Sequence, residues 1–216
     1  MATRTSPARE RIIATACELF YAHGIRGVGV DRVIAESGVA KATLYSHFRT
    51  KRDLVVAYLQ AADVYWQERL RAAAAAAGPE PRDQIIGVFG AIEAACREDG
   101  FRGCPFLNTA AESGPGSPIQ EAAAAHKRAV RAWIRDLARQ AGAPEPDATA
   151  RAITLLLDGA MSAAAMEGDP DVAIAAAATA RVIVETALGN RADPAVPGGP
   201  GPLAARSRRP RPAGRP

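Results

Sequence analysis

The chain has 216 residues, of which 48% are hydrophobic and 23% are charged, and its formal net charge is +4. This length is enough to bury a sizeable core, and the composition excludes wholesale disorder. The charge is uneven: residues 1–52 hold nine Lys and Arg against four Asp and Glu, residues 53–188 hold 12 against 18, and residues 189–216 hold six against one. A basic N-terminal segment on an acidic body is typical of a protein that presents one end to a polyanion.

The apolar runs and the cysteine spacing of the sequence exclude membrane, secreted and zinc-binding proteins. No segment approaches the roughly 18 apolar residues of a membrane helix, and no apolar run of a signal peptide follows the N-terminus. The three cysteines, Cys17, Cys96 and Cys104, have unrelated spacings that fit neither a disulfide framework nor a zinc site. We therefore expect a cytoplasmic protein with no membrane contact and no metal.

The N-terminal 50 residues predict three helices. They cover residues 9–24, 30–37 and 41–48, each with apolar side chains at helical spacing. Gly38 can take a positive φ in the tight turn between the second and third helices. Helix, glycine turn and helix at this spacing are typical of a helix-turn-helix. Its inward-facing residues are expected to be Val33, Ile34, Val39, Leu44 and Phe48.

Six further helices complete the predicted fold, which is all-α with about nine helices. Period-2 runs of β-branched residues are absent, and Gly or Pro residues separate the helical segments. The predicted domains are a DNA-binding domain over residues 1–50, a helical domain over 51–189, and a disordered basic tail over 190–216, because 12 of the 28 residues from 189 onward are Gly or Pro. The six helices are expected near residues 51–78, 82–98, 106–112, 118–141, 147–167 and 170–188.

The segment over residues 11–59 resembles the DNA-binding domain of the tetracycline-repressor (TetR) family. The resemblance rests on RIIATACELFYAHG, on VDRVIAESGVAKATLYSHFRTKRDLV and especially on TLYSHF followed by Lys51 and Leu54. GCPFLN at 103–108 is similar to a stretch found in a subset of that family. Ile34 stands where a small Ala is more usual and Gly29 where a Ser or Thr cap is usual; both can shift the second helix, and neither removes a DNA contact.

The resemblance implies a dimeric transcriptional regulator that binds double-stranded DNA and responds to a small molecule. Beyond the helix-turn-helix it implies only a variable, all-α domain for ligand binding and dimerisation. It also implies which residues contact DNA. Thr43, Tyr45, His47 and Lys51 match positions that touch the backbone, Lys41, Ala42 and Ser46 face the major groove, and Arg4 and Arg9 of the N-terminal arm reach phosphates or the minor groove.

A twofold dimer is expected because one recognition helix reads too few base pairs for specificity. The last two predicted helices are the candidate interface, since small residues permit close helix contact and larger apolar residues supply area. The small residues are Ala150, Thr154, Ala160, Ala164, Ala176, Thr179 and Ala180, and the larger ones are Leu157, Val172, Val182 and Ile183.

Three regulatory hypotheses stay open. The first is an apolar effector in the helical domain, although core packing explains each candidate lining residue equally well. The second is a sensor thiol at Cys104, which stands at a helix start where exposed N–H groups lower a thiol pKa; inert packing is its alternative. The third, an architectural DNA-binding protein without an effector, fits the large separate domain poorly. The candidate effector-lining residues are Trp66, Phe89, Phe106, Leu107, Trp133, Met161 and Met166.

No enzyme and no cofactor are expected. The three histidines have no carboxylate or nucleophile at a telling spacing, and no Gly-rich loop follows a strand. His126 stands among alanines on a long predicted helix, and we expect it at the surface or at a pocket edge rather than on a metal.

Overall fold

The computed structural model describes residues 6–189, and every regular element in this range is a helix. Val88 joins two of the segments through a helical backbone conformation, so α5 and α6 together correspond to one predicted helix. The predicted all-α fold with about nine helices is confirmed. Arg4 and the predicted tail over 190–216 lie outside the described residues. The segments are α1 (Pro7–Gly27), α2 (Val30–Ser37), α3 (Lys41–His47), α4 (Lys51–Ala76), α5 (Pro81–Gly87), α6 (Phe89–Cys96), α7 (Pro105–Glu112), α8 (Pro118–Gln140), α9 (Pro146–Glu167) and α10 (Asp171–Gly189).

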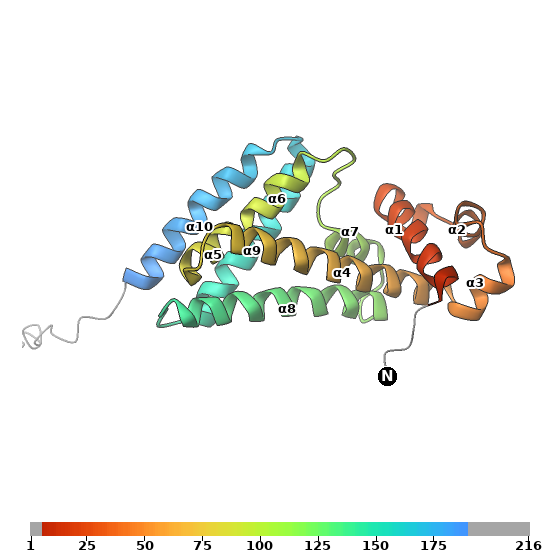
Figure 1. Ribbon diagram of the computed structural model, residues 1–216, viewed down its shortest axis with the longest axis horizontal. Coiled ribbons are helices and arrows are strands. Elements are labelled where there is room, and N and C mark those ends of the chain that lie inside the picture. The colour runs from red at the N-terminus through yellow and green to blue at the C-terminus, as the bar shows by residue number, and fades with distance from the viewer. Residues whose placement is uncertain (1–5, 190–216) are drawn as a thin grey trace, which may run out of the picture.

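The helices form a small head and a larger body that α4 connects (Figure 1). We call α1–α3 the head and α5–α10 the body. Helix α4 packs against α1 in the head and against α5, α6 and α8 in the body. It begins with a capping box, in which Thr50 Oγ1 accepts a hydrogen bond from the Asp53 N–H at 3.2 Å and the Asp53 carboxylate accepts one from the Thr50 N–H at 3.0 Å. The start of this long helix is therefore fixed beside α3.

The apolar side chains of the head pack the helix-turn-helix against α1 and belong to the same buried cluster as those of the body. Val33, Val39, Leu44 and Phe48 are buried as predicted, whereas Ile34 is only partly buried. Gly38 has φ 64° at the end of α2, so the predicted glycine turn is also confirmed. The rings of Phe20 on α1 and Tyr58 on α4 meet edge to face at 5.8 Å.

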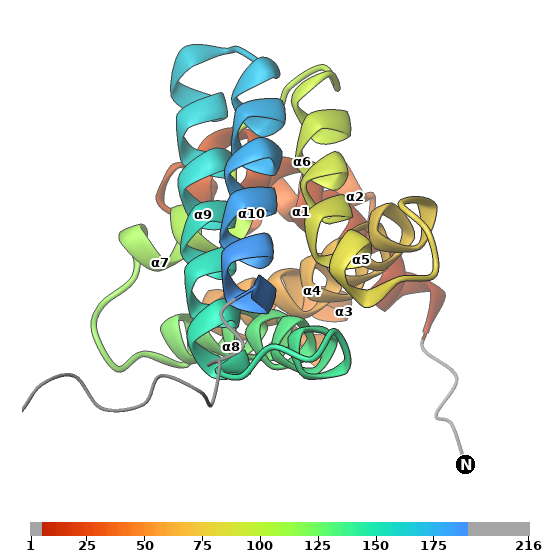
Figure 2. The same cartoon turned by 90° about the vertical axis from the view of Figure 1, so that its left-hand side faces the viewer.

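Helices α9 and α10 lie side by side at one end of the body (Figure 2). Five of the seven small residues predicted for the dimer interface are buried within the single chain, as is Leu157, which corrects their assignment; Thr154 is partly buried and Thr179 is exposed. Alanine at helical spacing permits close packing but does not specify whether the neighbouring helix belongs to the same chain. The buried residues are Ala150, Leu157, Ala160, Ala164, Ala176 and Ala180.

The outer face of these two helices is apolar and uncovered. Leu155 and Met166 on α9 are exposed, as are Ile174 and Val182 on α10. By length and composition α10 is apolar enough to cross a membrane, which corrects the prediction that no segment approaches such a span, and only 22% of that stretch is buried.

Candidate DNA-binding surface and effector cavity

Helix α3 presents polar side chains outward because its apolar side chains anchor it inward. Leu44 and Phe48, four residues apart, are buried, which turns the opposite side of the helix to solvent. Tyr45 is 43% exposed although it is aromatic, so the packing of the head does not require it. Lys41, Ala42 and Ser46 are also exposed, and Thr43 and His47 are partly buried at the edges of the same surface.

The polar contacts on this surface leave its side chains accessible. Lys41 Nζ lies 3.2 Å from Asp31 Oδ1 on α2, and both side chains are largely exposed, so the ion pair is weak. The Ser46 hydroxyl donates to the Thr43 carbonyl at 2.7 Å. These side chains can exchange such contacts for DNA without exposing a buried polar group.

Two further cations border α3. Lys51 is the first residue of α4, where the helix dipole adds partial positive charge. The guanidinium of Arg9 on α1 lies 5.5 Å from the centroid of the Phe48 ring. The structure therefore brings the predicted contacts together around one helix, except Arg4, which lies outside the described residues.

The head is tied to the body through α7. The Arg26 N–H donates to Glu112 Oε2 at 2.7 Å, and the Arg26 Nε–H donates to the Glu112 carbonyl at 3.0 Å. Tyr21 donates its hydroxyl to the Gly103 carbonyl at 3.1 Å and accepts from the Arg102 N–H at 2.9 Å. A movement of α7 would therefore be transmitted to α1 through these hydrogen bonds.

A cavity of about 260 Å³, here called the first cavity, lies among α4, α7, α8 and α9. Trp66, Phe106 and Met161 line it, as does Cys104, which is buried at the start of α7. The other predicted lining residues lie elsewhere, which corrects that part of the prediction. Phe89 is buried in the core, Leu107 and Met166 are exposed, and Trp133 is partly buried with Arg71 4.8 Å from its ring centroid.

His126 belongs to this cavity and is buried, which corrects the expectation of a surface position while agreeing with a pocket edge. Its ring stacks on Phe106 with the centroids 3.7 Å apart, and its Nδ1 lies 2.6 Å from Asp63 Oδ1 on α4. Burial lowers the pKa of His126, and the nearby Lys127 acts in the same direction, while the Asp63 hydrogen bond opposes the shift. His126 is therefore a neutral donor to Asp63 near neutral pH.

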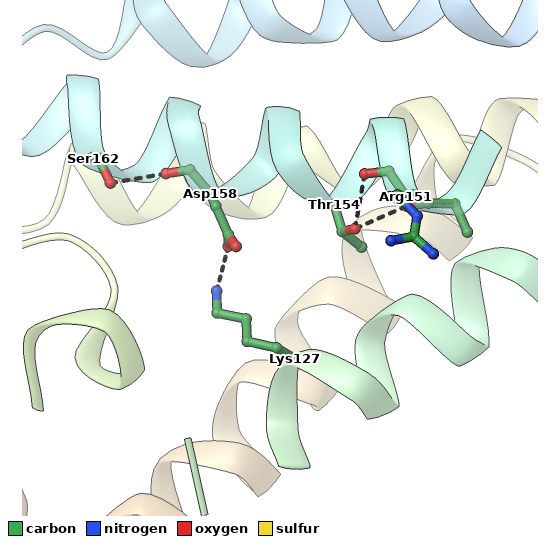
Figure 3. Close-up of polar contacts among 6 residues, drawn as sticks. Lys127, Arg151, Thr154, Asp158 and Ser162 are labelled. Carbon is green, nitrogen blue, oxygen red and sulfur yellow. Dashed lines mark hydrogen bonds and ion pairs between the residues drawn. The ribbon is translucent and has the colours of Figure 1, made fainter. Parts of the chain in front are cut away.

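The charged lining of the first cavity was missed by sequence reasoning. Lys127 Nζ on α8 pairs with Asp158 Oδ1 on α9 (Figure 3). Burial opposes the charge of Lys127, but the Cys104 thiol and the Asp158 carboxylate raise its pKa above the ordinary value. Arg131 and Arg151 also line the cavity. One signal was available: Lys127 is one of only three lysines in the chain and stands next to His126.

A second cavity, of about 390 Å³, lies between the head and the body. Tyr21 of α1 and Tyr58 of α4 are among its walls, together with the loop before α7. Trp66 and Pro105 line both cavities. Trp66 thus stands between the first cavity and the space beside α1.

Comparison with known proteins identifies relatives along most of the chain. Residues 12–58 match the family model described as bacterial regulatory proteins, tetR family, and residues 117–189 match the tetracyclin repressor-like C-terminal domain. The chain is 29% identical over 177 residues to the transcriptional regulator AcuR of Cereibacter sphaeroides, covering 77% of this chain and 80% of AcuR.

Solved structures agree over the whole fold. A TetR-family transcriptional regulator from Streptomyces coelicolor is 38% identical, with 85% of this chain and 95% of that chain covered and a TM-score of 0.72. A related regulator from Streptomyces avermitilis is 30% identical, with 84% and 98% covered and a TM-score of 0.70. Together with the helix-turn-helix in the head, these matches establish that the chain belongs to the TetR family of DNA-binding transcriptional regulators.

Proposed function

We propose that this protein is a cytoplasmic, homodimeric repressor that releases a palindromic operator when a small molecule fills the first cavity. The observation that carries the proposal is the continuity of α4. This one helix begins with Lys51 beside α3 and contributes Trp66 to the cavity wall. A shift of α4 at the cavity would move the head as a unit, because Tyr58 of the same helix packs on Phe20 of α1.

Dimerisation is supported by the outer face of α9 and α10. Leu155, Ile174 and Val182 each expose apolar side-chain surface on these two helices in the described chain, and exposed apolar surface of this kind is typical of protein interfaces. A second copy placed across this face would bury it with twofold symmetry. Two heads at a fixed separation then read two half-sites, so a change in that separation releases the DNA.

The experiment that tests this function starts from purified protein and DNA sites selected from a random pool. Small organic molecules are screened by thermal shift, since only a ligand of the folded state raises the melting temperature. Hits are then tested for release of fluorescent operator. Trp66→Phe should keep ligand-free operator affinity and weaken release, because it alters the cavity wall and leaves α3 untouched. Full release by this variant at unchanged ligand concentrations would contradict the role of Trp66.

A thiol sensor is the second candidate, because Cys104 lines the first cavity next to Lys127. The variant Cys104→Ser separates the two mechanisms. A non-covalent ligand that still releases operator from Cys104→Ser supports the effector mechanism. Release by oxidants or electrophiles that this variant abolishes, with no non-covalent ligand found, supports the thiol sensor instead.

A further inference from the structure

The first cavity combines an apolar floor with an excess of positive charge. Trp66, Phe106 and Met161 belong to its apolar part. Its lining contains three cationic side chains, Lys127, Arg131 and Arg151, and a single carboxylate, Asp158. His126 adds no charge near neutral pH because burial keeps it neutral. The side chains that line the cavity therefore carry a net charge of about +2 near neutral pH.

Among the three cationic side chains of the cavity, only Lys127 forms an ion pair in the described residues. Lys127 is matched by Asp158, whereas within residues 6–189 neither Arg131 nor Arg151 forms an ion pair. Arg131 follows Lys127 by four residues on α8, and Arg151 precedes Asp158 by seven on α9, so each lies on the cavity side of its helix. Figure 3 shows the α9 side of this arrangement, with Arg151 and Thr154 one turn apart.

We propose that the ligand of the first cavity is a small organic carboxylate, held by the guanidinium groups of Arg131 and Arg151 with its apolar part against Phe106 and Trp66. This proposal rests on the proposed function and names its effector class. A guanidinium presents paired N–H donors that match the two oxygens of a carboxylate. A cavity of about 260 Å³ is small for a ligand pocket, which fits a single ring or a short branched chain.

Other ligand charges fit this lining less well. An organic cation would meet two arginines that form no ion pair. The one carboxylate in the cavity lining, Asp158, is already paired with Lys127. A neutral ligand would gain only apolar burial, because Arg131 and Arg151 are exposed and stay hydrated when no charged group approaches them. An anion alone neutralises the excess charge of the lining.

The ion pair between Lys127 and Asp158 connects ligand binding to the packing of α8 against α9. Within the described chain, Lys127–Asp158 is the one ion pair that joins α8 to α9. A carboxylate beside Arg131 and Arg151 competes with Asp158 for Lys127. The contact between α8 and α9 would then loosen next to the apolar outer face of α9, where Leu155 lines the cavity and is also exposed.

The test uses three probes that share one carbon skeleton: 3-phenylpropanoate, its neutral amide and 3-phenylpropylamine. Binding to the full-length protein is measured by titration calorimetry near neutral pH. We expect the acid to bind at least about tenfold more tightly than the amide, and the amine to bind least. In Arg131→Gln/Arg151→Gln the acid and the amide should become equal. The control Arg97→Gln/Arg139→Gln removes two exposed arginines outside the cavity and should keep the preference.

Three results would overturn the proposal. They are equal binding of acid and amide by the unmodified protein, a preference that survives in Arg131→Gln/Arg151→Gln, and no binding of the acid at millimolar concentration. Operator binding and dimerisation are measured on the same preparations to separate this proposal from the proposed function. A protein that binds operator and is released only by neutral or cationic molecules overturns the carboxylate alone. A protein that neither dimerises nor binds a selected operator overturns the function.

Discussion

Lys51 supplies a phosphate contact in the proposed complex, and it stands at the start of α4. Replacing it by alanine removes one positive charge without touching the residues that face the bases. We expect Lys51→Ala to weaken binding about equally at all DNA sequences and to reduce the salt dependence by about one counterion. Fluorescence anisotropy at several salt concentrations measures both quantities.

The matched control for Lys51 is Arg82→Ala. Arg82 is exposed on α5 in the body, so the variant loses the same charge away from the head. It should bind as the unmodified protein does. If Lys51→Ala kept both its affinity and its salt slope, Lys51 would not be a DNA contact.

His126 gives stability a pH dependence whose sign follows from its environment. Burial lowers its pKa below the ordinary 6.5, although it faces Asp63 of α4 and Asp158 of α9, with Lys127 beside it on α8. The unfolded chain therefore takes up a proton more readily than the folded one, and stability should fall as pH drops below about 6.5. Chemical unfolding over this range should show a shallower dependence for His126→Gln, and an unchanged slope for the exposed control His23→Gln. If the free energy of unfolding depended equally on pH in both variants, His126 would not be the cause of the pH dependence.

The sequence alone predicted site residues that a local pattern marks, such as helical spacing of apolar side chains. It did not predict residues that only tertiary packing brings together. The outward positions of α3 followed from Leu44 and Phe48 at helical spacing. Trp66 and Phe106 were identifiable as large apolar residues of a helical domain. Lys127 and Asp158 stand 31 positions apart, and no local pattern predicts that α8 and α9 place them in one cavity.

Helix boundaries were predictable wherever capping or turn residues mark them. Gly38 and the apolar spacing define the helix-turn-helix, and Thr50-x-x-Asp53 is a readable capping pattern. The interruption at Val88 directly follows Gly87, the last residue of α5, a glycine inside the helix predicted over residues 82–98. The alanines of α9 and α10 were misassigned to the dimer interface because alanine periodicity is the same for packing within and between chains, whereas Val182, predicted with them, is exposed.

Gly24 tests the junction between head and body. It has φ 76° and ψ 159° inside α1, a region that only glycine readily adopts, and an added Cβ would lie 2.5 Å from Glu112 Oε1. Gly24→Ala should lower the free energy of unfolding by about 1–3 kcal/mol and loosen the contact between Arg26 and Glu112. Denaturant titration measures the loss.

The neighbouring glycine provides the control for Gly24. Gly27 has open space around its Cβ position, so Gly27→Ala should change stability little. Equal stability of Gly24→Ala and the unmodified protein would show that the head can sit on α7 without this close approach.

At the scale of the whole molecule, the outer face of α9 and α10 should hold two copies together. Val182 is 63% exposed on α10, and an aspartate there would be buried without a partner in the dimer. Val182→Asp should weaken self-association by at least about tenfold, as measured by sedimentation. Val64→Asp makes the same change at a valine of α4 that is 57% exposed and should leave the dimer intact. A Val182→Asp protein that sediments as the unmodified dimer would place the interface elsewhere.

In the proposed function, ligand binding and DNA binding are linked through α4, which reaches from Lys51 to the cavity wall. We propose that the ligand shifts the cavity wall at Trp66 and that α4 carries this shift to the head. Linkage requires that operator weaken ligand binding by the same factor by which ligand weakens operator binding, with a coupling of about 1–3 kcal/mol.

Selection of duplex sites from a random pool by the purified protein tests the central claim most directly, when it is followed by measurement of the protein-to-DNA ratio on the recovered sequence. We expect an inverted repeat whose half-sites lie about 34 Å or somewhat more apart along the duplex, occupied by a whole number of dimers. Recovery of a single unrepeated half-site bound by one protomer, or no enrichment of any sequence, would contradict it.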